Sequence, residues 1–363
     1  MRLVWVELRD FRSYHECLLR PDAGTNLLIG PNGAGKTNFL EAVSYLGWLR
    51  SFRRVPEQSM VLEGADSAVV RTEVTSGDIH TVLGVEVPIK GRRRVALNGK
   101  PLRTSGVLSD HIRVVVFFPD DLDIVKRGPG GRREFLDDCG AELWPGARAD
   151  LQDYERALRQ RNALLKRLGR DFDLPTLQVW DEKLSQAAGR VMSRRARTMR
   201  MLDRYLSEMY AVLAGGPAKM QIDYRSSWLR GFPEGASEVE AQLLDALGAV
   251  RRLDADRRVT TIGPHRDDPS LLLDGHEART YLSQGEQRTV ALALRLAMHH
   301  AILDQTGEQP ILLLDDVFSE LDRVRAGALA AVLPDSQTFI TTTAEEEVPV
   351  TGVRFRVAPG SIR

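Results

Sequence analysis

The chain has 363 residues, 43% of them hydrophobic, which is long enough and apolar enough to bury a large core in two domains. Its 50 basic and 50 acidic residues cancel, which excludes a strongly basic surface over the whole chain but leaves a local one, or one assembled by dimerisation, open. The two cysteines, Cys17 and Cys139, lack metal-ligand spacing, and neither a signal peptide nor an apolar run of membrane-spanning length is visible, so we expect a cytoplasmic protein with reduced thiols.

The first informative element is a glycine-rich loop between a predicted strand, residues 25–29, and a predicted amphipathic helix that opens at residues 38–43. The phosphate-binding pattern G-x-x-x-x-G-K-[ST] is matched by Gly30, Pro31, Asn32, Gly33, Ala34, Gly35, Lys36 and Thr37. The glycines let backbone N–H groups turn inward and hold an anion together with the helix N-terminus. We expect Lys36 at the β- and γ-phosphates of a nucleoside triphosphate and the Thr37 hydroxyl at Mg²⁺. A chance glycine-rich turn is the alternative.

The next part of the chain changes from strands to helices. Residues up to about 118 are predicted to be mainly strands, with Asn98-Gly99 as a hairpin turn between residues 94–97 and Leu102. From about residue 120 to residue 253 the pattern is mostly helical, without the sustained heptads of a long coiled coil. Strand patterns return at residues 259–262 and 271–273.

One helix of the middle region carries an arginine stripe. Its basic side chains recur at steps of three and four residues: Arg190, Arg194, Arg197, Arg200 and Arg204. Apolar residues recur on another side and predict the packed face: Met192, Ala196, Met199, Leu202, Leu206 and Met209. The stripe is a candidate for binding DNA phosphates, and a solvated helix face is the alternative.

A later segment, Ser283-Gln284-Gly285-Glu286-Gln287, predicts the start of a helix that runs to about Leu303. Ser283 stands at the N-cap position, and Glu286 three residues later completes a capping box. The positive end of the helix dipole then lies near Ser283 and could face a γ-phosphate. An ordinary capped helix is the alternative.

An apolar run, residues 311–314, is followed by two acids and is typical of a buried parallel strand. Asp315 is then expected at the carboxyl edge of the sheet, where α/β proteins bind ligands, and we assign it to Mg²⁺. Asp316 is the candidate general base for the attacking water. The alternative is that both acids cap the next helix.

The P-loop, the Ser-x-Gly-x-Gln helix start and the acidic strand end together resemble ABC-type ATPases, which close as dimers over two nucleotides. The resemblance implies that Ser283, Gly285 and Gln287 contact the nucleotide of a second copy. ABC-type ATPases usually carry Glu at the position of Asp316, and the shorter Asp implies slow turnover.

Further segments, spread along nearly the whole chain, resemble the RecF family of bacterial recombination-mediator ATPases, which are related to SMC heads. The similar segments are residues 8–14 (LRDFRSY), 119–122 (PDDL), 128–137 (GPGGRREFLD), 160–165 (QRNALL), 263–268 (GPHRDD) and 315–322 (DDVFSELD). His265, in the fifth of these segments, is expected to be a structural histidine rather than a catalytic one.

The resemblance implies an α/β fold with an SMC-like, ABC-type P-loop ATPase head. Residues 1–119 and 259–363 would form this discontinuous head, and residues 120–258 an inserted, mainly helical arm. It also implies that Arg12 lies near the nucleotide and that Asp322 crosses the dimer interface.

The family's activity implies the following functional expectations. The chain would bind ATP with Mg²⁺, form an ATP-dependent homodimer and hydrolyse ATP weakly, with stimulation by DNA. Its partners would be double-stranded DNA, single/double-strand junctions, gaps, RecR and RecO, with which it would help to load a recombinase at the nucleoid. No membrane partner is expected.

Two features depart from ABC-type ATPases. The Q-loop glutamine is not evident in Val114-Val115-Val116-Phe117-Phe118, and residues 339–343 end in threonines where a switch histidine is expected. These differences favour a slow switch over a fast motor. The rival interpretations are an ABC transporter subunit, an SMC-like structural tether, which the short insertion disfavours, and a P-loop kinase, which has no need of Ser283.

Overall fold

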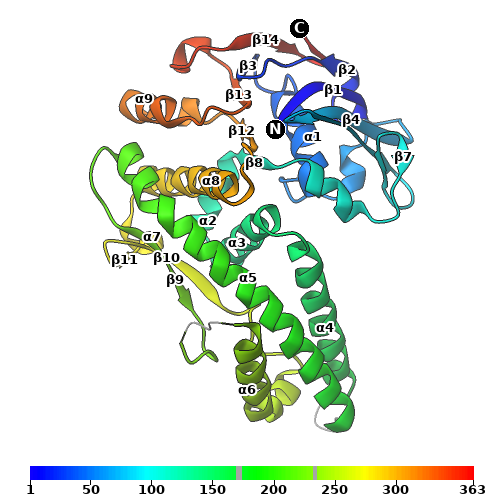
Figure 1. The fold of residues 1–363 in the computed structure, drawn as a ribbon, viewed down its shortest axis with the longest axis vertical. Helices are drawn as coiled ribbons and strands as arrows, with labels where there is room; N and C mark the ends of the chain where they lie inside the picture. The colour runs from blue at the N-terminus through cyan, green and yellow to red at the C-terminus, as the bar shows by residue number, and fades with distance from the viewer. Residues whose placement is uncertain (169–173, 232–234) are drawn as a thin grey trace. The chain divides into compact units, whose positions relative to one another are not determined.

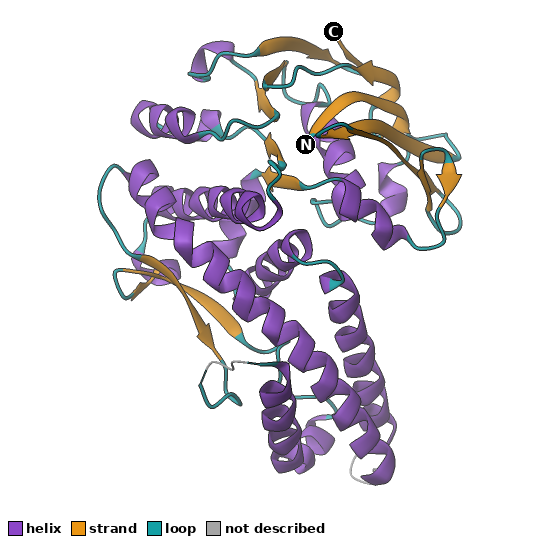
Figure 2. Cartoon of the chain, viewed as in Figure 1, coloured by secondary structure: helices purple, strands orange, loops and turns teal. Residues whose placement is uncertain are grey.

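A computed structural model describes residues 1–168, 174–231 and 235–363 of the chain. The chain forms two compact units. The head unit comprises Met1–Asp121, Val212–Gly216 and Met298–Arg363, and the arm unit comprises Leu122–Ala211 and Pro217–Ala297. Figures 1 and 2 show strands concentrated in the head unit and helices in the arm unit.

A six-stranded sheet, in the order β15-β14-β3-β13-β12-β8, forms one layer of the head unit. Its strands are β3 (Thr25–Ile29), β8 (Val114–Phe117), β12 (Ile311–Leu314), β13 (Thr338–Thr342), β14 (Val353–Ala358) and β15 (Ser361–Ile362). All neighbours pair in parallel except β14 and β15. The carboxyl ends of β3, β12 and β13 therefore lie at one edge, where the predicted P-loop and acids follow their strands.

A second six-stranded sheet, antiparallel and in the order β2-β1-β4-β5-β6-β7, forms the other layer. Its strands are β1 (Arg2–Phe11), β2 (Tyr14–Leu19), β4 (Ser67–Ser76), β5 (Ile79–Pro88), β6 (Arg94–Leu97) and β7 (Lys100–Pro101). The predicted hairpin turn is confirmed: Asn98 and Gly99 join β6 to β7 with φ of 49° and 75°. Positive φ at both residues is typical of a type I′ turn.

Helix α1 (Lys36–Trp48) contacts both sheets, and its apolar residues join theirs in one core. Eleven of its 13 residues are buried, so the helix has no exposed polar face of the kind that the predicted amphipathic pattern implied. The core surrounds the helix that carries the P-loop at its N-terminus, so this end is held rigidly.

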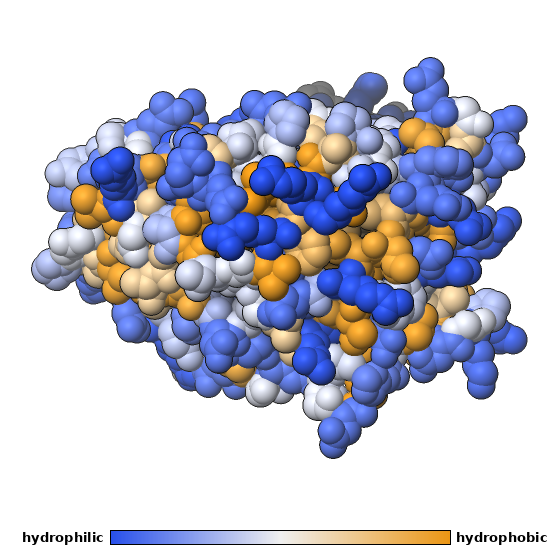
Figure 3. Space-filling view, turned by 90° about the horizontal axis from the view of Figure 1, so that it is seen from above, coloured by the Kyte–Doolittle hydropathy of each residue, from blue (hydrophilic) through white to orange (hydrophobic). Residues whose placement is uncertain are grey.

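Figure 3 shows a face on which hydrophobic residues gather between strongly hydrophilic ones.

The arm unit is built from long helices and a three-stranded sheet. The helices are α2 (Leu122–Lys126), α3 (Pro129–Leu143), α4 (Ala147–Leu168), α5 (Leu174–Ala214), α6 (Ala236–Arg257), α7 (Ala278–Tyr281) and the first part of α8 (Gln284–Thr306). The antiparallel sheet, in the order β11-β10-β9, comprises β9 (Met220–Arg225), β10 (Asp268–Leu273) and β11 (His276–Glu277).

One prediction for this region is wrong, because residues 259–262 form no strand. The mostly helical pattern up to residue 253 is confirmed, although β9 interrupts it. The second boundary of the inserted domain also differs from the predicted one, because the structure divides after Ala297 rather than after residue 258. The reason is that β10 pairs with β9, which keeps residues 259–297 with the arm unit.

The remaining elements are short. They are helix α9 (Arg323–Val332) and the 3₁₀ turns η1 (Glu57–Met60), η2 (Ser105–His111), η3 (Pro119–Asp121), η4 (Phe318–Glu320) and η5 (Glu345–Glu347). Within the described ranges, no helix combines the length and apolar composition needed to cross a bilayer.

Candidate functional site

The P-loop connects β3 to α1, as predicted, and two of its glycines have no tolerated replacement. Gly35 has φ of 109°, and an added Cβ would lie 2.8 Å from the Ser13 hydroxyl oxygen. At Gly30, an added Cβ would lie 2.2 Å from the Val357 carbonyl oxygen. Both spacings are shorter than any van der Waals contact, so neighbouring strands hold the loop backbone in place.

The loop borders a cavity of about 270 Å³. Its lining residues are Asn32, Gly33, Gly35, Lys36, Thr37, Asn38, Arg53, Asp315, Asp316 and Thr341. Residues nearly 280 positions apart in sequence, such as Thr37 and Asp315, thus meet at one edge of the parallel sheet. The cavity contains both the anion-binding loop and the two acids that the sequence singled out.

Lys36 crosses the base of the loop. Its ammonium donates to the carbonyl oxygens of Gly30 at 2.5 Å and Pro31 at 3.0 Å. Burial lowers the pKa of Lys36, while the nearby carboxylates of Asp316 and Asp315 oppose this shift. The side chain thus lies at the loop carbonyls and near both acids.

Asp315 accepts two hydroxyl hydrogen bonds on the same oxygen. Thr37 Oγ1 donates to Asp315 Oδ1 at 2.9 Å, and Thr341 Oγ1 donates to it at 2.8 Å. Burial raises the pKa of the Asp315 carboxyl, and the two threonine hydroxyls partly offset this. A hydroxyl and a carboxylate side by side next to a phosphate-binding loop form the oxygen donor set that Mg²⁺ takes in such sites.

Asp316 has a different environment. Its backbone is left-handed, with φ of 51°, and its N–H donates to Thr341 Oγ1 at 2.8 Å. Its Oδ1 is buried and has no hydrogen-bond partner among the described residues, although the residue lines the cavity. A desolvated carboxylate oxygen without a donor is suited to accept a proton from a bound water. Thr341, at the end of β13, thus links the two acids where the sequence lacks a histidine.

The prediction that Arg12 lies near the nucleotide stays a prediction. Its Nε and Nη2 donate to both carboxylate oxygens of buried Glu41 at 2.8 Å, and its Nη1 donates to the Ser59 carbonyl at 2.7 Å. The arginine that lines the cavity is Arg53, which lies 3.9 Å from Glu41. Arg12 and Arg53 thus share the carboxylate of Glu41.

The signature segment lies in the arm unit, where Ser283 begins α8 as predicted. Ser283 Oγ donates to Glu286 Oε2 at 2.6 Å, and the Ser283 N–H donates to the same oxygen at 2.9 Å. Ser283 is exposed and Gly285 is half-buried, so the helix N-terminus is accessible.

Gln287 is different. Its amide is buried and donates to the carbonyl oxygens of Leu282 at 3.0 Å and Arg279 at 3.2 Å. The predicted nucleotide contact of Gln287 is therefore corrected to a brace for the turn before α8.

Asp322 is the N-cap of α9. Its Oδ1 accepts a hydrogen bond from the Arg325 N–H at 2.9 Å, and its side chain is 57% exposed. The residue thus has a structural contact and also a free surface on which a second copy could bind.

The arginine stripe lies on α5, and its predicted packed side is confirmed as buried. The stripe is not uniformly free, however. Asp150 accepts from Arg190 at 2.9 Å and from Arg194 at 2.7 Å, and Arg197 lies 4.0 Å above the ring centroid of Trp144. All of these arginines except Arg194 are exposed. The stripe therefore offers less positive charge to DNA than its sequence suggests.

Two of the family-like segments are linked by buried ion pairs within the arm unit. Arg132 binds Asp268 with both ends of its guanidinium, at 2.7 and 2.9 Å, and Arg195 binds Asp137 in the same way, at 2.7 and 2.8 Å. Arg133 donates to the carbonyl oxygen of Asp267 at 2.7 Å. These residues hold the arm unit together and none lines the nucleotide cavity.

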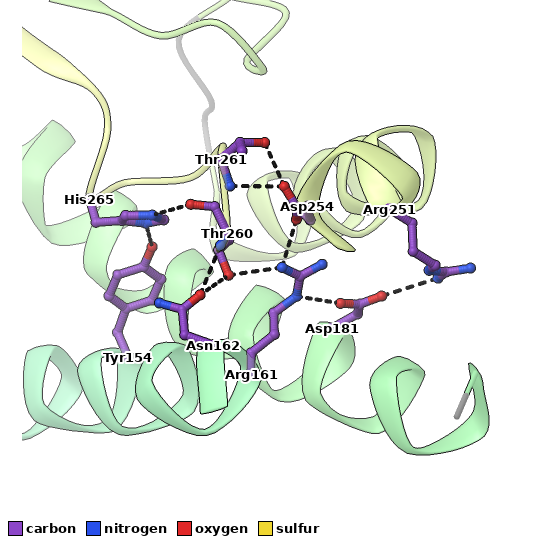
Figure 4. Close-up of polar contacts among 9 residues, drawn as sticks. All are labelled: Tyr154, Arg161, Asn162, Asp181, Arg251, Asp254, Thr260, Thr261 and His265. Carbon is purple, nitrogen blue, oxygen red and sulfur yellow. Dashed lines mark hydrogen bonds and ion pairs between the residues drawn. The ribbon is translucent and has the colours of Figure 1, made fainter. Parts of the chain in front are cut away.

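A second buried network surrounds Arg161 (Figure 4). Its guanidinium donates to Asp181 and Asp254 at 2.7 Å each and to Thr260 at 2.8 Å. All four side chains are fully buried.

His265 belongs to the edge of the same network and is structural, as predicted. Tyr154 Oη lies 2.6 Å from its Nδ1, and its Nε2 lies 3.2 Å from the Thr260 carbonyl oxygen. Burial lowers the pKa of His265 to about 4, so the ring is neutral, with Tyr154 donating to Nδ1 and Nε2 donating to the carbonyl.

Three residues of the cavity were not predicted: Asn38, Arg53 and Thr341. Asn38 follows directly after the P-loop, which was a signal available in the sequence. Arg53 reaches the cavity from the segment beyond α1, and no motif marks it. Thr341 was noticed only as the place of an absent histidine.

Comparisons with known proteins agree along the full length. The family model described as RecF/RecN/SMC N terminal domain matches residues 2–358. A protein named DNA replication and repair protein RecF from Acidothermus cellulolyticus is 39% identical, with 98% of each chain covered. Proteins of the same name from Frankia alni and Streptomyces avermitilis are 37% and 36% identical, each covering 100% of this chain and 99% of the relative.

Solved structures give the same result. One described as the recombination mediator protein RecF-ATPrS in the RecFOR pathway superposes with a TM-score of 0.92 at 32% identity, covering 99% of this chain and 97% of that one. An Smc head bound to the C-winged helix domain of ScpA reaches a TM-score of 0.59 at 17% identity, covering 100% and 96%, which shows a shared fold only.

Proposed function

Because this chain belongs to the RecF family of DNA replication and repair proteins, we propose that it is an ATP-dependent DNA-binding protein of recombinational repair and replication restart. The observation that carries the proposal is the convergence of Lys36, Thr37, Asp315 and Asp316 on one cavity. A related structure at 32% identity is described as RecF-ATP, which supports ATP as the nucleotide.

The P-loop residues bind the triphosphate of ATP. Backbone N–H groups of Gly33 to Lys36 and the N-terminus of α1 surround the phosphates, and the Lys36 ammonium exchanges loop carbonyls for β- and γ-phosphate oxygens. Thr37 and Asp315 would hold Mg²⁺, which neutralises phosphate charge when bound. Arg53, the other cation of the cavity, adds positive charge for the phosphates.

Asp316 serves the attacking water. Its partnerless Oδ1 accepts a proton from the water as the water oxygen attacks the γ-phosphorus, and the products are ADP and phosphate. An aspartate reaches less far than a glutamate, so we expect weak ATP hydrolysis. This hydrolysis acts as a switch and is stimulated by DNA.

A second copy of the chain completes each site. The exposed Ser283 and the neighbouring Gly285 lie at the N-terminus of α8, whose dipole favours the γ-phosphate held by the other copy. Asp322 lies in the same dimer interface. ATP binding closes the dimer on DNA, and hydrolysis opens it.

The partners are double-stranded DNA and single/double-strand junctions, including gaps, together with RecR and RecO for loading a recombinase. The description of a related structure as a recombination mediator in the RecFOR pathway supports this choice. We place the protein in the cytoplasm, at the nucleoid.

Sedimentation with and without ATP, repeated with duplex, single-stranded and gapped DNA, tests the proposal. We expect the wild type to dimerise with ATP and to bind DNA more tightly as a dimer. Lys36→Ala, which removes the phosphate-binding cation, should do neither at the same ATP concentration. If ATP changes neither the sedimenting mass nor the DNA affinity of the wild type, the proposed function is contradicted.

A further inference from the structure

The segment from residue 87 to residue 109, in the head unit, carries a strong excess of basic residues. It contains six basic residues and no acidic one, although the whole chain has equal numbers of both. The basic residues are Lys90, Arg92, Arg93, Arg94, Lys100 and Arg103. The segment follows β5 and forms β6, the edge strand β7 and the loops around them (Figure 1).

Two of these cations are used inside the protein. Arg93 is half-buried and its Nη1 contacts the carboxylate of Glu57 and the carbonyl oxygen of Leu49, the C-cap of α1. Arg94 binds both carboxylate oxygens of Glu86, at 3.0 and 3.1 Å. Arg93 therefore anchors the base of the hairpin on the helix that carries the P-loop.

The other four cations are exposed, and their side chains make no hydrogen bond or ion pair with any residue that the structure describes. Lys90 and Arg92 lie in the loop before β6. Lys100 opens the edge strand β7 opposite Leu97, and Arg103 follows Leu102, whose N–H donates to the Val95 carbonyl of β6. We call Lys90, Arg92, Lys100 and Arg103 the hairpin cations.

We propose that the hairpin cations form a surface that binds the phosphate backbone of DNA. The inference rests on the proposed DNA-binding function and assigns it a place. Phosphates of one DNA strand follow each other about every 3.4 Å along the helix axis, so a cluster of cations on one hairpin can contact several of them at once. Free cations gain most from phosphates, because no internal ion pair has to be broken first.

The α5 stripe makes the contrast clear. Arg190 and Arg194 already share Asp150, whereas the hairpin cations have no acid beside them in sequence or contact. A polyanion with an evenly spaced backbone therefore fits the hairpin cations better than it fits the α5 stripe.

The test is the salt dependence of duplex DNA binding with ATP present. The variant Lys90→Gln/Arg92→Gln/Lys100→Gln/Arg103→Gln should lower the log–log slope by roughly three to four, since each lost phosphate contact lowers it by about 0.9. The matched control is Arg190→Gln/Arg194→Gln/Arg197→Gln/Arg200→Gln, which removes four arginines from α5 and should change the slope less. A Lys90→Arg/Lys100→Arg variant, which keeps the charge, should bind DNA like the wild type.

ATP binding to the hairpin variant should equal that of the wild type, which shows that the head unit is folded. If the wild type binds no DNA, the proposed function fails. If the wild type binds DNA and only the α5 variant loses slope, the hairpin assignment is overturned. It is overturned equally if the hairpin variant keeps its DNA slope but loses binding to polyglutamate, because the surface is then a dock for an acidic protein segment.

Discussion

At the scale of single residues, the two neighbouring acids differ in what they contact. Asp315 accepts hydrogen bonds from the hydroxyls of Thr37 and Thr341, so its carboxylate lies beside the P-loop. Asp316 turns away through its left-handed backbone and keeps one buried oxygen without a donor among the described residues. One position in the chain thus separates the proposed metal ligand from the proposed acceptor of a proton.

We predict that Asp316→Asn binds ATP normally and hydrolyses it at least tenfold more slowly, since the amide cannot accept the proton of water. Asp315→Asn should instead weaken Mg²⁺-dependent ATP binding, because it removes the negative charge beside Thr37. Nucleotide affinity by fluorescence and single-turnover hydrolysis measure the two effects separately. Equal losses of affinity in both variants would show that the acids do not divide their roles in this way.

The neutral ring of His265 predicts a dependence of stability on pH. Its folded pKa of about 4 lies below the ordinary value of 6.5, so only the unfolded chain takes up a proton between these values. Stability is therefore complete above pH 6.5 and falls as the pH drops toward 4, by up to about 3 kcal/mol for this residue. Urea unfolding at several pH values should show a shallower decline for His265→Gln. Parallel declines for both proteins would mean that His265 does not contribute to the pH dependence of stability.

At the scale of elements, the Arg161 network joins three helices to the segment after α6. Arg161 lies on α4, Asp181 on α5 and Asp254 on α6, and Thr260 follows α6 (Figure 4). The buried cation and its two buried carboxylates stabilise the fold only together, because removing one charge leaves the others desolvated and uncompensated.

We predict that Arg161→Met destabilises the protein by about 3–5 kcal/mol, since it leaves two aspartates buried without this partner. Arg251→Gln is the matched control: Arg251 also binds Asp181, at 3.1 Å, but it is partly exposed, so its loss should cost less. Urea unfolding followed by circular dichroism gives both values. An Arg161→Met protein within 1 kcal/mol of the control would show that the network contributes little.

Local patterns predicted the elements whose reasons are local. The P-loop, the strand before Asp315, the Asn98-Gly99 turn and the capping box of Ser283 all depend on residues within a few positions of each other. The strand prediction for residues 259–262 was wrong because it followed from their β-branched side chains. In the structure, Asn162 accepts hydrogen bonds from the Thr260 N–H and hydroxyl, and Asp254 accepts them from Thr261.

The site was predictable to the same extent. Lys36, Thr37, Asp315 and Asp316 carry their chemistry in motifs, and all four line the cavity. Arg53 was not predicted, because no motif marks it; it lines the cavity from the segment beyond α1 and lies 3.9 Å from Glu41. Contacts of this kind depend on how distant segments pack, and no spacing in the sequence encodes them.

At the scale of the whole molecule, the nucleotide cavity and the Ser283 helix end belong to different compact units. A change at Ser283 can therefore leave the cavity intact. This separation allows ATP binding and dimerisation to be measured independently.

We predict that Ser283→Arg binds ATP like the wild type but forms no ATP-dependent dimer. The bulky cation replaces a small exposed N-cap at the position proposed to meet the phosphate of a second copy. Ser283→Thr, which keeps a capping hydroxyl, is the control and should dimerise. Sedimentation with ATP compares the three proteins. A dimer of Ser283→Arg at wild-type yield would exclude the shared site.

The order of strands in the parallel sheet has a consequence for how the protein is made. Strand β3, which leads into the P-loop, is flanked by β13 and β14, whose residues are added more than 300 positions later. On a ribosome, both edges of β3 must therefore remain unpaired until more than 300 further residues have been synthesised. Pairing across such a long separation is slow, and open strand edges attract other chains in the meantime. The ability to bind nucleotide is then acquired late for each new chain, only after β13 and β14 have emerged.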